Sequence, residues 1–284
     1  MPAIRLGLIG DNIAASRSPA LHRLAGEMCG LDVSYDLLVP RELKLDFDAV
    51  FDRARDDGYR GLNITLPYKE RAFARVRIDE PIVRSIAACN TVVFEGREAI
   101  GTNTDYTGFV AAYRANFGTA GPGRAAMAGC GGVGKAIGFG LAALGAEALH
   151  LFDTERSRAE KLARALVAVY PALDVHIAAS VELASASADG LVNCTPLGMI
   201  GYGGSAFPEA VFRGRRWVFD AVYTPIDTPF LLAARAAGLS IMGGYELLLY
   251  QGVECFRTFT GREISPVELR RALAEFDAQS PKIR

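Results

Sequence analysis

The chain has 284 residues, half of them hydrophobic, and its 31 lysines and arginines nearly balance its 32 aspartates and glutamates. This balance, without a run of like charges at either end, argues against nucleic acid as a partner. Five scattered cysteines and three histidines argue against a disulfide scaffold and a metal site, and the N-terminal apolar run is too short for a membrane helix, so we expect a cytoplasmic protein with no membrane partner.

Strands and helices alternate along the first half of the chain. Short apolar runs predict strands at 4–10, 33–39, 61–65 and 90–94. Helical patterns, two of them opened by proline, lie between or after them at 19–30, 46–57, 67–75 and 105–117. The alternation predicts an α/β fold with a mostly parallel sheet. The Gly/Pro-rich stretch 118–124 is the predicted domain boundary, giving domains 1–118 and 119–261.

The second half repeats the alternation. Strands are predicted at 125–129, 147–152, 174–178, 190–194 and 216–222, with helices between them. Near the end, Ser265 and Glu268 form the pattern of a capping box with Pro266 at the first helical position, which predicts a helix over 266–277.

A glycine cluster separates the strand at 125–129 from the helix expected to begin near Lys135. Its G-x-G-x-x-G pattern predicts a turn that holds the pyrophosphate of a dinucleotide, and the expected cofactor-binding residues are Gly129, Gly131, Gly132, Val133 and Gly134. Asp153 ends the next strand at the distance expected of an acid that binds the adenine ribose, which favours NAD over NADP. The alternatives are a purely structural turn, and an Asp153 that only caps a helix while Arg156 or Arg158 binds the 2′-phosphate of NADP.

Three polar segments of the first half follow predicted strands or begin predicted helices, and they contain Ser16, Ser18, Asn63, Thr65, Lys69 and Asp105. Because ligands of open α/β sheets bind outside the carboxyl ends of strands, these segments could converge. Each residue also has a purely structural explanation as a helix cap, a turn residue or a solvated surface group. Beside a hydride acceptor, Lys69 paired with Asp105 would supply the acid/base group that alcohol oxidation requires. Asn90 and the other polar residues would bind a small polyol acid.

Several motifs in the same order make the chain resemble the shikimate dehydrogenases and their quinate/shikimate relatives over nearly its full length. The matching segments are SRSPALH (16–22), GLNITLPYK (61–69), AACNTVV (87–93), GTNTDYTGF (101–109), AGCGGVGKA (128–136), VNCTPLGM (192–199), FDAVYTPIDTPFL (219–231) and GGYELLLYQGVECFRTFTG (243–261).

The resemblance implies an N-terminal α/β substrate domain, a C-terminal Rossmann domain and a last helix, about 262–284, that packs back on the first domain. It implies Lys69 and Asp105 as the catalytic pair, and a substrate site that gains Tyr223 and Gln251 from the second domain. It also implies that Thr195, Ala221 and Gly244 line the cofactor site, to which we add Arg158.

The departures from the family pattern concern the cofactor. Biosynthetic members commonly have Asn-Arg-Thr/Ser where this chain has Asp153-Thr154-Glu155, and an acid there is similar to the NAD-using quinate/shikimate dehydrogenases. We therefore expect NAD, with NADP as the alternative, and a monomer or homodimer that oxidises shikimate or quinate. The rival hypotheses are a dehydrogenase for another polyol acid or for a folate-linked carbon unit, and a non-catalytic dinucleotide sensor on the same fold.

Overall fold

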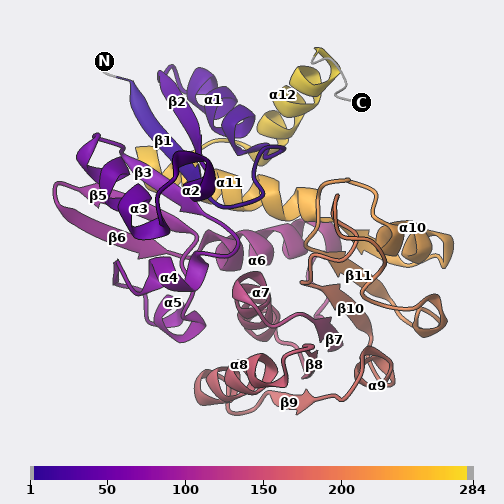
Figure 1. Ribbon diagram of the computed structural model, residues 1–284. Coiled ribbons are helices and arrows are strands. Elements are labelled where there is room, and N and C mark those ends of the chain that lie inside the picture. The colour runs from indigo at the N-terminus through magenta and orange to yellow at the C-terminus, as the bar shows by residue number, and fades with distance from the viewer. Residues whose placement is uncertain (1–2, 280–284) are drawn as a thin grey trace. The chain divides into compact units, whose positions relative to one another are not determined.

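A computed structural model describes residues 3–279, and these divide into two compact units. Unit 1 contains the residues up to Thr104 and those from Leu249 onward, and unit 2 is Asp105–Leu248. Residues 1–2 and 280–284 of the predicted domains lie outside the described residues. Figure 1 shows the helices and strands of both units, coloured along the chain from indigo at the N-terminus to yellow at the C-terminus.

The division differs from the predicted boundaries at 118/119 and 261/262, and aromatic packing explains both shifts. Phe109 of helix α6 (Thr104–Phe117) makes an edge contact with Phe219 of unit 2 at 5.0 Å between ring centroids. At the far end of α11 (Gly244–Thr260), Phe259 lies 5.7 Å from the ring of His22 in unit 1. The Gly/Pro-rich stretch indicated a break in the chain, but buried side chains decide which unit each helix joins.

Unit 1 is built on a six-stranded sheet in the order β2-β1-β3-β5-β6-β4. Its strands are β1 (Ile4–Ile9), β2 (Val33–Leu38), β3 (Gly61–Ile64), β4 (Arg77–Ile78), β5 (Thr91–Glu95) and β6 (Glu98–Thr102). Its helices are α1 (Ser18–Met28), α2 (Pro40–Leu43), α3 (Phe47–Asp56), α4 (Lys69–Phe73), α5 (Pro81–Ile86), α12 (Pro266–Gln279) and the end of α11. Only β5, among the described strands of this sheet, is antiparallel to its neighbours.

Unit 2 is a doubly wound parallel sheet. The order β12-β11-β10-β7-β8-β9 is that of a Rossmann domain. Its strands are β7 (Arg124–Ala128), β8 (Ala148–Phe152), β9 (Asp174–Ile177), β10 (Gly190–Asn193), β11 (Trp217–Asp220) and β12 (Ser240–Met242). Besides α6 and the start of α11, its helices are α7 (Gly132–Ala143), α8 (Arg156–Val169), α9 (Val181–Ser185), the short 3₁₀ helix η1 (Glu209–Val211) and α10 (Pro229–Ala236). The predicted α/β class, with an N-terminal α/β domain and a Rossmann domain, is confirmed.

The C-terminal helix α12 begins where the capping pattern places it. Ser265 Oγ accepts the backbone N–H of Glu268 at 3.4 Å, which satisfies one donor of the first turn. Figure 1 shows α12 beside α1, and Asp277 on α12 forms an ion pair with Arg17 at the start of α1. Among residues 3–279, no helix is long and apolar enough to span a bilayer.

Candidate functional site

The predicted polar segments of unit 1 meet at one edge of its sheet. The carboxyl ends of β1, β3 and β6 lie at this edge, and so does the start of β5, because β5 runs in the opposite direction. In the sheet register, Thr91 lies opposite Asn63 on β3 and opposite Thr102 on β6. The reversal of β5 therefore brings Asn90, just before this strand, beside side chains that follow strand ends.

Asn63 and Asn90 are the centre of a buried hydrogen-bond network at this edge. Asn63 Nδ2 donates to the backbone oxygen of Asn90 and to Thr91 Oγ1, both at 3.3 Å. Its Oδ1 accepts from the Tyr35 hydroxyl at 2.9 Å. Asn90 Oδ1 accepts the backbone N–H of Thr104 at 2.7 Å and so caps the start of α6. Protein partners thus orient both amides, as buried polar groups require.

The thiol of Cys255 lies inside the same network, and sequence reasoning did not assign it a role. Its Sγ lies 3.0 Å from Asn63 Nδ2, 3.1 Å from Thr91 Oγ1 and 2.9 Å from Thr104 Oγ1. It donates to Gln251 Oε1 at 3.3 Å, one helical turn earlier on α11. Gln251, which was expected from the second domain, lies on the part of α11 that is assigned to unit 1.

Replacing Cys255 by alanine should lower the free energy of unfolding by about 1–3 kcal/mol, because buried polar groups lose a partner. Cys255→Ser retains a donor and an acceptor and should recover part of the loss. Urea unfolding at neutral pH measures both variants, with Cys29→Ala, a half-buried cysteine of the same unit, as the control. A Cys255→Ala protein as stable as that control would contradict the role given to the thiol.

The predicted serine pair lies at the end of the loop after β1. Ser16 Oγ accepts the backbone N–H of Ser18 at 3.2 Å and lies 3.2 Å from Ser18 Oγ. Ser18 is buried and is the first residue of α1, and Ser16 is half-buried. Arg17 between them is the residue that pairs with Asp277, so the C-terminal helix helps to fix the serine loop.

Thr65 and Lys69 follow β3 at the same edge. The Thr65 backbone N–H donates to the oxygen of Ile9 at 2.9 Å. Lys69 is the half-buried first residue of α4, and its carbonyl accepts the N–H of Cys89 at 2.9 Å. The sequence predicted a helix over 67–75, and the observed helix is shorter at both ends. Asp105, the other predicted catalytic residue, is buried and follows Thr104 directly in the chain.

The glycine cluster of unit 2 forms a tight turn between β7 and α7. Gly129 has a φ of +94°, and a Cβ there would lie 2.7 Å from the carbonyl carbon of Cys194. A Cβ on Gly134 would lie 2.1 Å from the oxygen of Gly129, so this glycine permits α7 to pack against the turn. Around Gly131 a Cβ would meet open space. Helix α7 begins at Gly132, earlier than predicted, which places Val133 in its first turn.

This turn lies at the switch point of the sheet, since β7 pairs with both β8 and β10. Dinucleotides bind at this point in doubly wound sheets, and the first N–H groups of a helix have no partner within it. The cluster therefore fits a pyrophosphate: the side-chain-free position at Gly131 leaves room for it, and the start of α7 favours an anion.

Asp153 is held against the glycine turn by its own hydrogen bonds. Its Oδ2 accepts the backbone N–H of Cys130 at 2.7 Å, and its Oδ1 accepts that of Glu155 at 2.8 Å. Arg158 Nε pairs with Glu155 at 2.8 Å, and Arg156 pairs with a glutamate of its own helix at 3.0 Å. Each arginine that could accompany a 2′-phosphate is thus already beside a carboxylate.

A second buried network, missed by sequence reasoning, joins the ends of β10 and β11. Asp220 accepts from Asn193 Nδ2 at 2.9 Å and from the Thr228 hydroxyl at 2.5 Å, and burial raises the pKa of Asp220 to about 6. Asn193 Oδ1 in turn accepts the backbone N–H of Thr195 at 2.9 Å. The signal available in the sequence was a polar residue at the carboxyl end of each of two buried strands.

The remaining predicted residues of unit 2 lie in or against the loop after β11. Ala221 donates its N–H to the oxygen of Asn193 at 2.8 Å. A Cβ on Gly244, at the start of α11, would lie 2.5 Å from the Ala221 oxygen, so only glycine permits this approach. Tyr223 is half-buried in the same loop. Thr195, Ala221 and Gly244 therefore lie around the carboxyl ends of β10 and β11.

Comparisons with known proteins match shikimate and quinate dehydrogenases. The family model described as the shikimate dehydrogenase substrate binding domain matches residues 8–92. The quinate/shikimate dehydrogenase (NAD(+)) of Corynebacterium efficiens is 38% identical over 277 residues, which cover 95% of this chain and 97% of that protein.

Two solved structures resemble the chain over nearly its whole length. Quinate dehydrogenase from Corynebacterium glutamicum in complex with NAD has a TM-score of 0.87 at 34% identity, covering 96% of this chain and 99% of that one. Shikimate 5-dehydrogenase from Thermus thermophilus, in complex with NADP(H) and shikimate, has a TM-score of 0.82 at 31% identity, with the same coverage of both chains.

Proposed function

Because this chain belongs to the shikimate dehydrogenase family, we propose that it transfers a hydride between a nicotinamide cofactor and the ring hydroxyl of shikimate. The corresponding ketone is 3-dehydroshikimate. We propose that the enzyme also acts on quinate. The observation that carries the proposal is the convergence of the family's polar motifs at one edge of the unit 1 sheet. A polyol acid offers several hydroxyls and a carboxylate, and this edge offers matching hydroxyl and amide groups. The proposed substrate-binding residues are Ser16, Ser18, Asn63, Thr65, Asn90, Tyr223 and Gln251.

Oxidation of the ring hydroxyl removes a hydride from carbon and a proton from oxygen. The nicotinamide, when bound, accepts the hydride. Lys69 is the proposed base that takes the hydroxyl proton and returns it in the reverse direction, and the carboxylate of Asp105 orients the lysine. Two observations support this pair. Lys69 follows β3 at the polar edge. Asp105 directly follows Thr104, whose N–H and hydroxyl bond to the Asn90 side chain.

The cofactor proposed here is NAD in preference to NADP. The proposed dinucleotide site is the glycine turn with its neighbours Gly129, Gly131, Gly132, Val133, Gly134, Asp153, Arg158, Thr195, Ala221 and Gly244. A 2′-phosphate near Asp153 and Glu155 would meet two carboxylates, and the guanidinium of Arg158 is already paired with Glu155. The relatives include both NAD- and NADP-using enzymes, so the preference depends on these side chains.

Replacing Asp153 by asparagine should narrow the preference for NAD, because the charge that repels the 2′-phosphate is removed. We expect the ratio of kcat/KM for NAD to that for NADP to fall about tenfold. Asp174→Asn, an exposed carboxylate on the neighbouring strand β9, is the control and should leave the ratio unchanged. A wild-type enzyme that prefers NADP several-fold would refute the argument from Asp153.

The overall proposal is tested by the absorbance of reduced nicotinamide with the purified protein, using shikimate and quinate, each with NAD and with NADP. We expect turnover of shikimate, with NAD the better cofactor, and the rate with quinate decides which acid is preferred. Binding of NAD without turnover of either acid would favour the dinucleotide-sensor hypothesis instead.

We also propose that the enzyme is a monomer or homodimer that works in a reducing, cytoplasmic compartment. All five cysteines are free thiols, which suits such a compartment.

A further inference from the structure

The short helix α4 depends on other elements for its position. It has five residues and begins at Lys69, and isolated helices of this length do not persist in water. The contacts that α4 and its flanking residues make with α3 are therefore among those that fix where the Lys69 backbone lies within unit 1.

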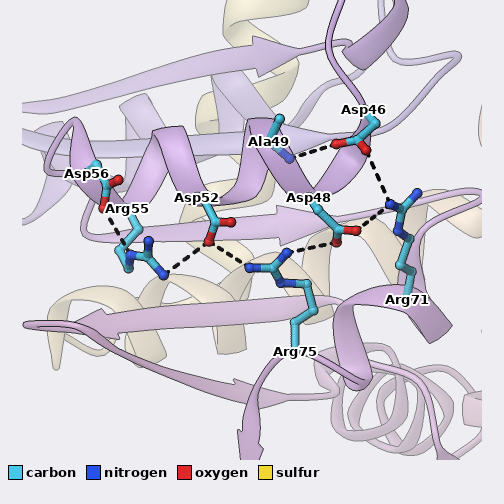
Figure 2. Close-up of polar contacts among 8 residues, drawn as sticks. All are labelled: Asp46, Asp48, Ala49, Asp52, Arg55, Asp56, Arg71 and Arg75. Atoms are coloured by element: carbon cyan, nitrogen blue, oxygen red, sulfur yellow. Dashed lines mark hydrogen bonds and ion pairs between the residues drawn. The ribbon is translucent and has the colours of Figure 1, made fainter.

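Ion pairs link α4 and the residues just after it to one face of α3. Figure 2 shows two arginines that reach across to three aspartates. Arg71 pairs with Asp48 and, at 3.7 Å, with Asp46, and Arg75 pairs with Asp48 at 2.9 Å and with Asp52 at 2.6 Å. Hydrogen bonds from both arginines hold the pKa of Asp48 below its ordinary value. Asp48 is therefore a charged link shared by both arginines.

Contacts with aromatic rings of α3 also link it to α4 and its flanking residues. The guanidinium carbon of Arg71 lies 5.5 Å from the centre of the Phe47 ring, and that of Arg75 lies 5.0 Å from the centre of the Phe51 ring. Tyr68, the residue before Lys69, stacks on Phe47 with ring centres 4.9 Å apart. Planar guanidinium groups can pair with carboxylates and lie over rings at once, which a lysine does less well.

Residues on both sides of Lys69 along the chain thus contact α3. Tyr68 precedes it, and Arg71 and Arg75 follow it. The Cys89 N–H donates to the Lys69 carbonyl oxygen at 2.9 Å. A misplacement of about 1 Å in a reacting group can lower a rate about 100-fold, so small movements of α4 have large consequences for a base at its first residue.

We propose that Arg71 and Arg75 are positioning residues, which hold Lys69 at its working place through the acidic face of α3. The inference rests on the proposed function, in which Lys69 is the acid/base. Exposed ion pairs contribute little to global stability, and these side chains are partly exposed. Their effect should therefore appear in the chemical step more than in the stability of the fold.

The test is the double variant Arg71→Gln/Arg75→Gln, assayed with shikimate and the preferred cofactor. We expect kcat to fall about tenfold and the KM for shikimate to change less than twofold, with the thermal midpoint little altered. Arg71→Lys/Arg75→Lys keeps both charges and should recover part of kcat. The matched control is Arg53→Gln, because Arg53 lies on α3 but pairs at 3.4 Å with Asp57, the residue that follows the same helix.

A salt titration of the wild-type enzyme and of the glutamine double variant gives a second test. The Debye length falls from about 10 Å at 0.1 M to about 3 Å at 1 M ionic strength. Rising salt should therefore lower the kcat of the wild type toward that of the glutamine double variant, while the variant itself changes little.

Either of two results would overturn the inference: a kcat of the double variant within twofold of the wild type, or an equal loss in Arg53→Gln. Lys69→Ala, assayed in parallel, separates this failure from failure of the proposed function. If Lys69→Ala is inactive and the double variant is fully active, only the positioning role is lost. If Lys69→Ala retains full turnover, the proposed chemistry and the positioning role are both wrong.

Discussion

Replacing Lys69 by alanine is expected to lower kcat about 1,000-fold, because general acid–base groups typically contribute factors of about 10² to 10⁴. Alanine removes the only group that we propose for accepting the hydroxyl proton. The affinity for NAD should remain within about threefold of the wild type, since the proposed dinucleotide-binding residues lie in unit 2 and Lys69 lies in unit 1. Steady-state kinetics and isothermal titration calorimetry measure the two quantities.

Lys44→Ala is the control for this experiment, because Lys44 is an exposed lysine of the same unit that follows α2. It should retain wild-type kcat. Turnover by Lys69→Ala near the wild-type rate would remove the lysine from the mechanism. A loss of NAD affinity equal to the loss of kcat would indicate a damaged protein instead of a missing base.

The elements that the sequence predicted best are those with a strong local pattern. The apolar run that became β1 and the capping pattern of α12 are found within a few residues of their expected bounds. The strands β4, β6 and β12 were missed, since they are short or follow a tight hairpin. The turn between β5 and β6 contains Gly96, which has a φ of +62°. A glycine at this place is typical of a tight hairpin, so the sequence did contain a signal for it.

The site residues likewise divide into those that local motifs selected and those that they did not. Motifs and strand ends were enough to select Asn63 and Asn90, which lie together at the polar edge. Cys255 was not selected, because its role depends on partners distant in sequence. Asp220 bonds to Thr228, eight residues away, and to Asn193 on the neighbouring strand, and the pairing with Asn193 depends on the order of the strands in the sheet. Cys255 Sγ contacts Asn63, 192 residues away, at 3.0 Å. Local patterns carry no information about such pairings, and topology alone brings them together.

His22 is a further residue whose character only the fold reveals. The residue is 1% exposed, and its ring stacks on Tyr35 with ring centres 4.9 Å apart. Its Nδ1 has no hydrogen-bond partner within residues 3–279. Burial lowers the pKa of His22 from 6.5 to about 3, since the charged imidazolium would lose its hydration.

This lowered pKa makes the stability of the protein sensitive to acid. Between pH 6.5 and about 3 the unfolded chain binds a proton that native His22 excludes, so the free energy of unfolding falls as the pH falls through this window. At 1.36 kcal/mol per pH unit, the contribution of His22 to the free energy of unfolding falls by about 3 kcal/mol between pH 7 and pH 4.

The variant that tests this is His22→Phe, which keeps a ring against Tyr35 and cannot titrate. The free energy of unfolding of the wild type minus that of the variant should fall by about 3 kcal/mol between pH 7 and pH 4, as measured by urea unfolding. His176→Gln, which alters a half-exposed histidine of unit 2, is the control and should show a much smaller change. An NMR titration in which the His22 ring gains its proton near pH 6.5 would contradict the prediction, because a ring that charges at its ordinary pKa imposes no acid penalty on the native state.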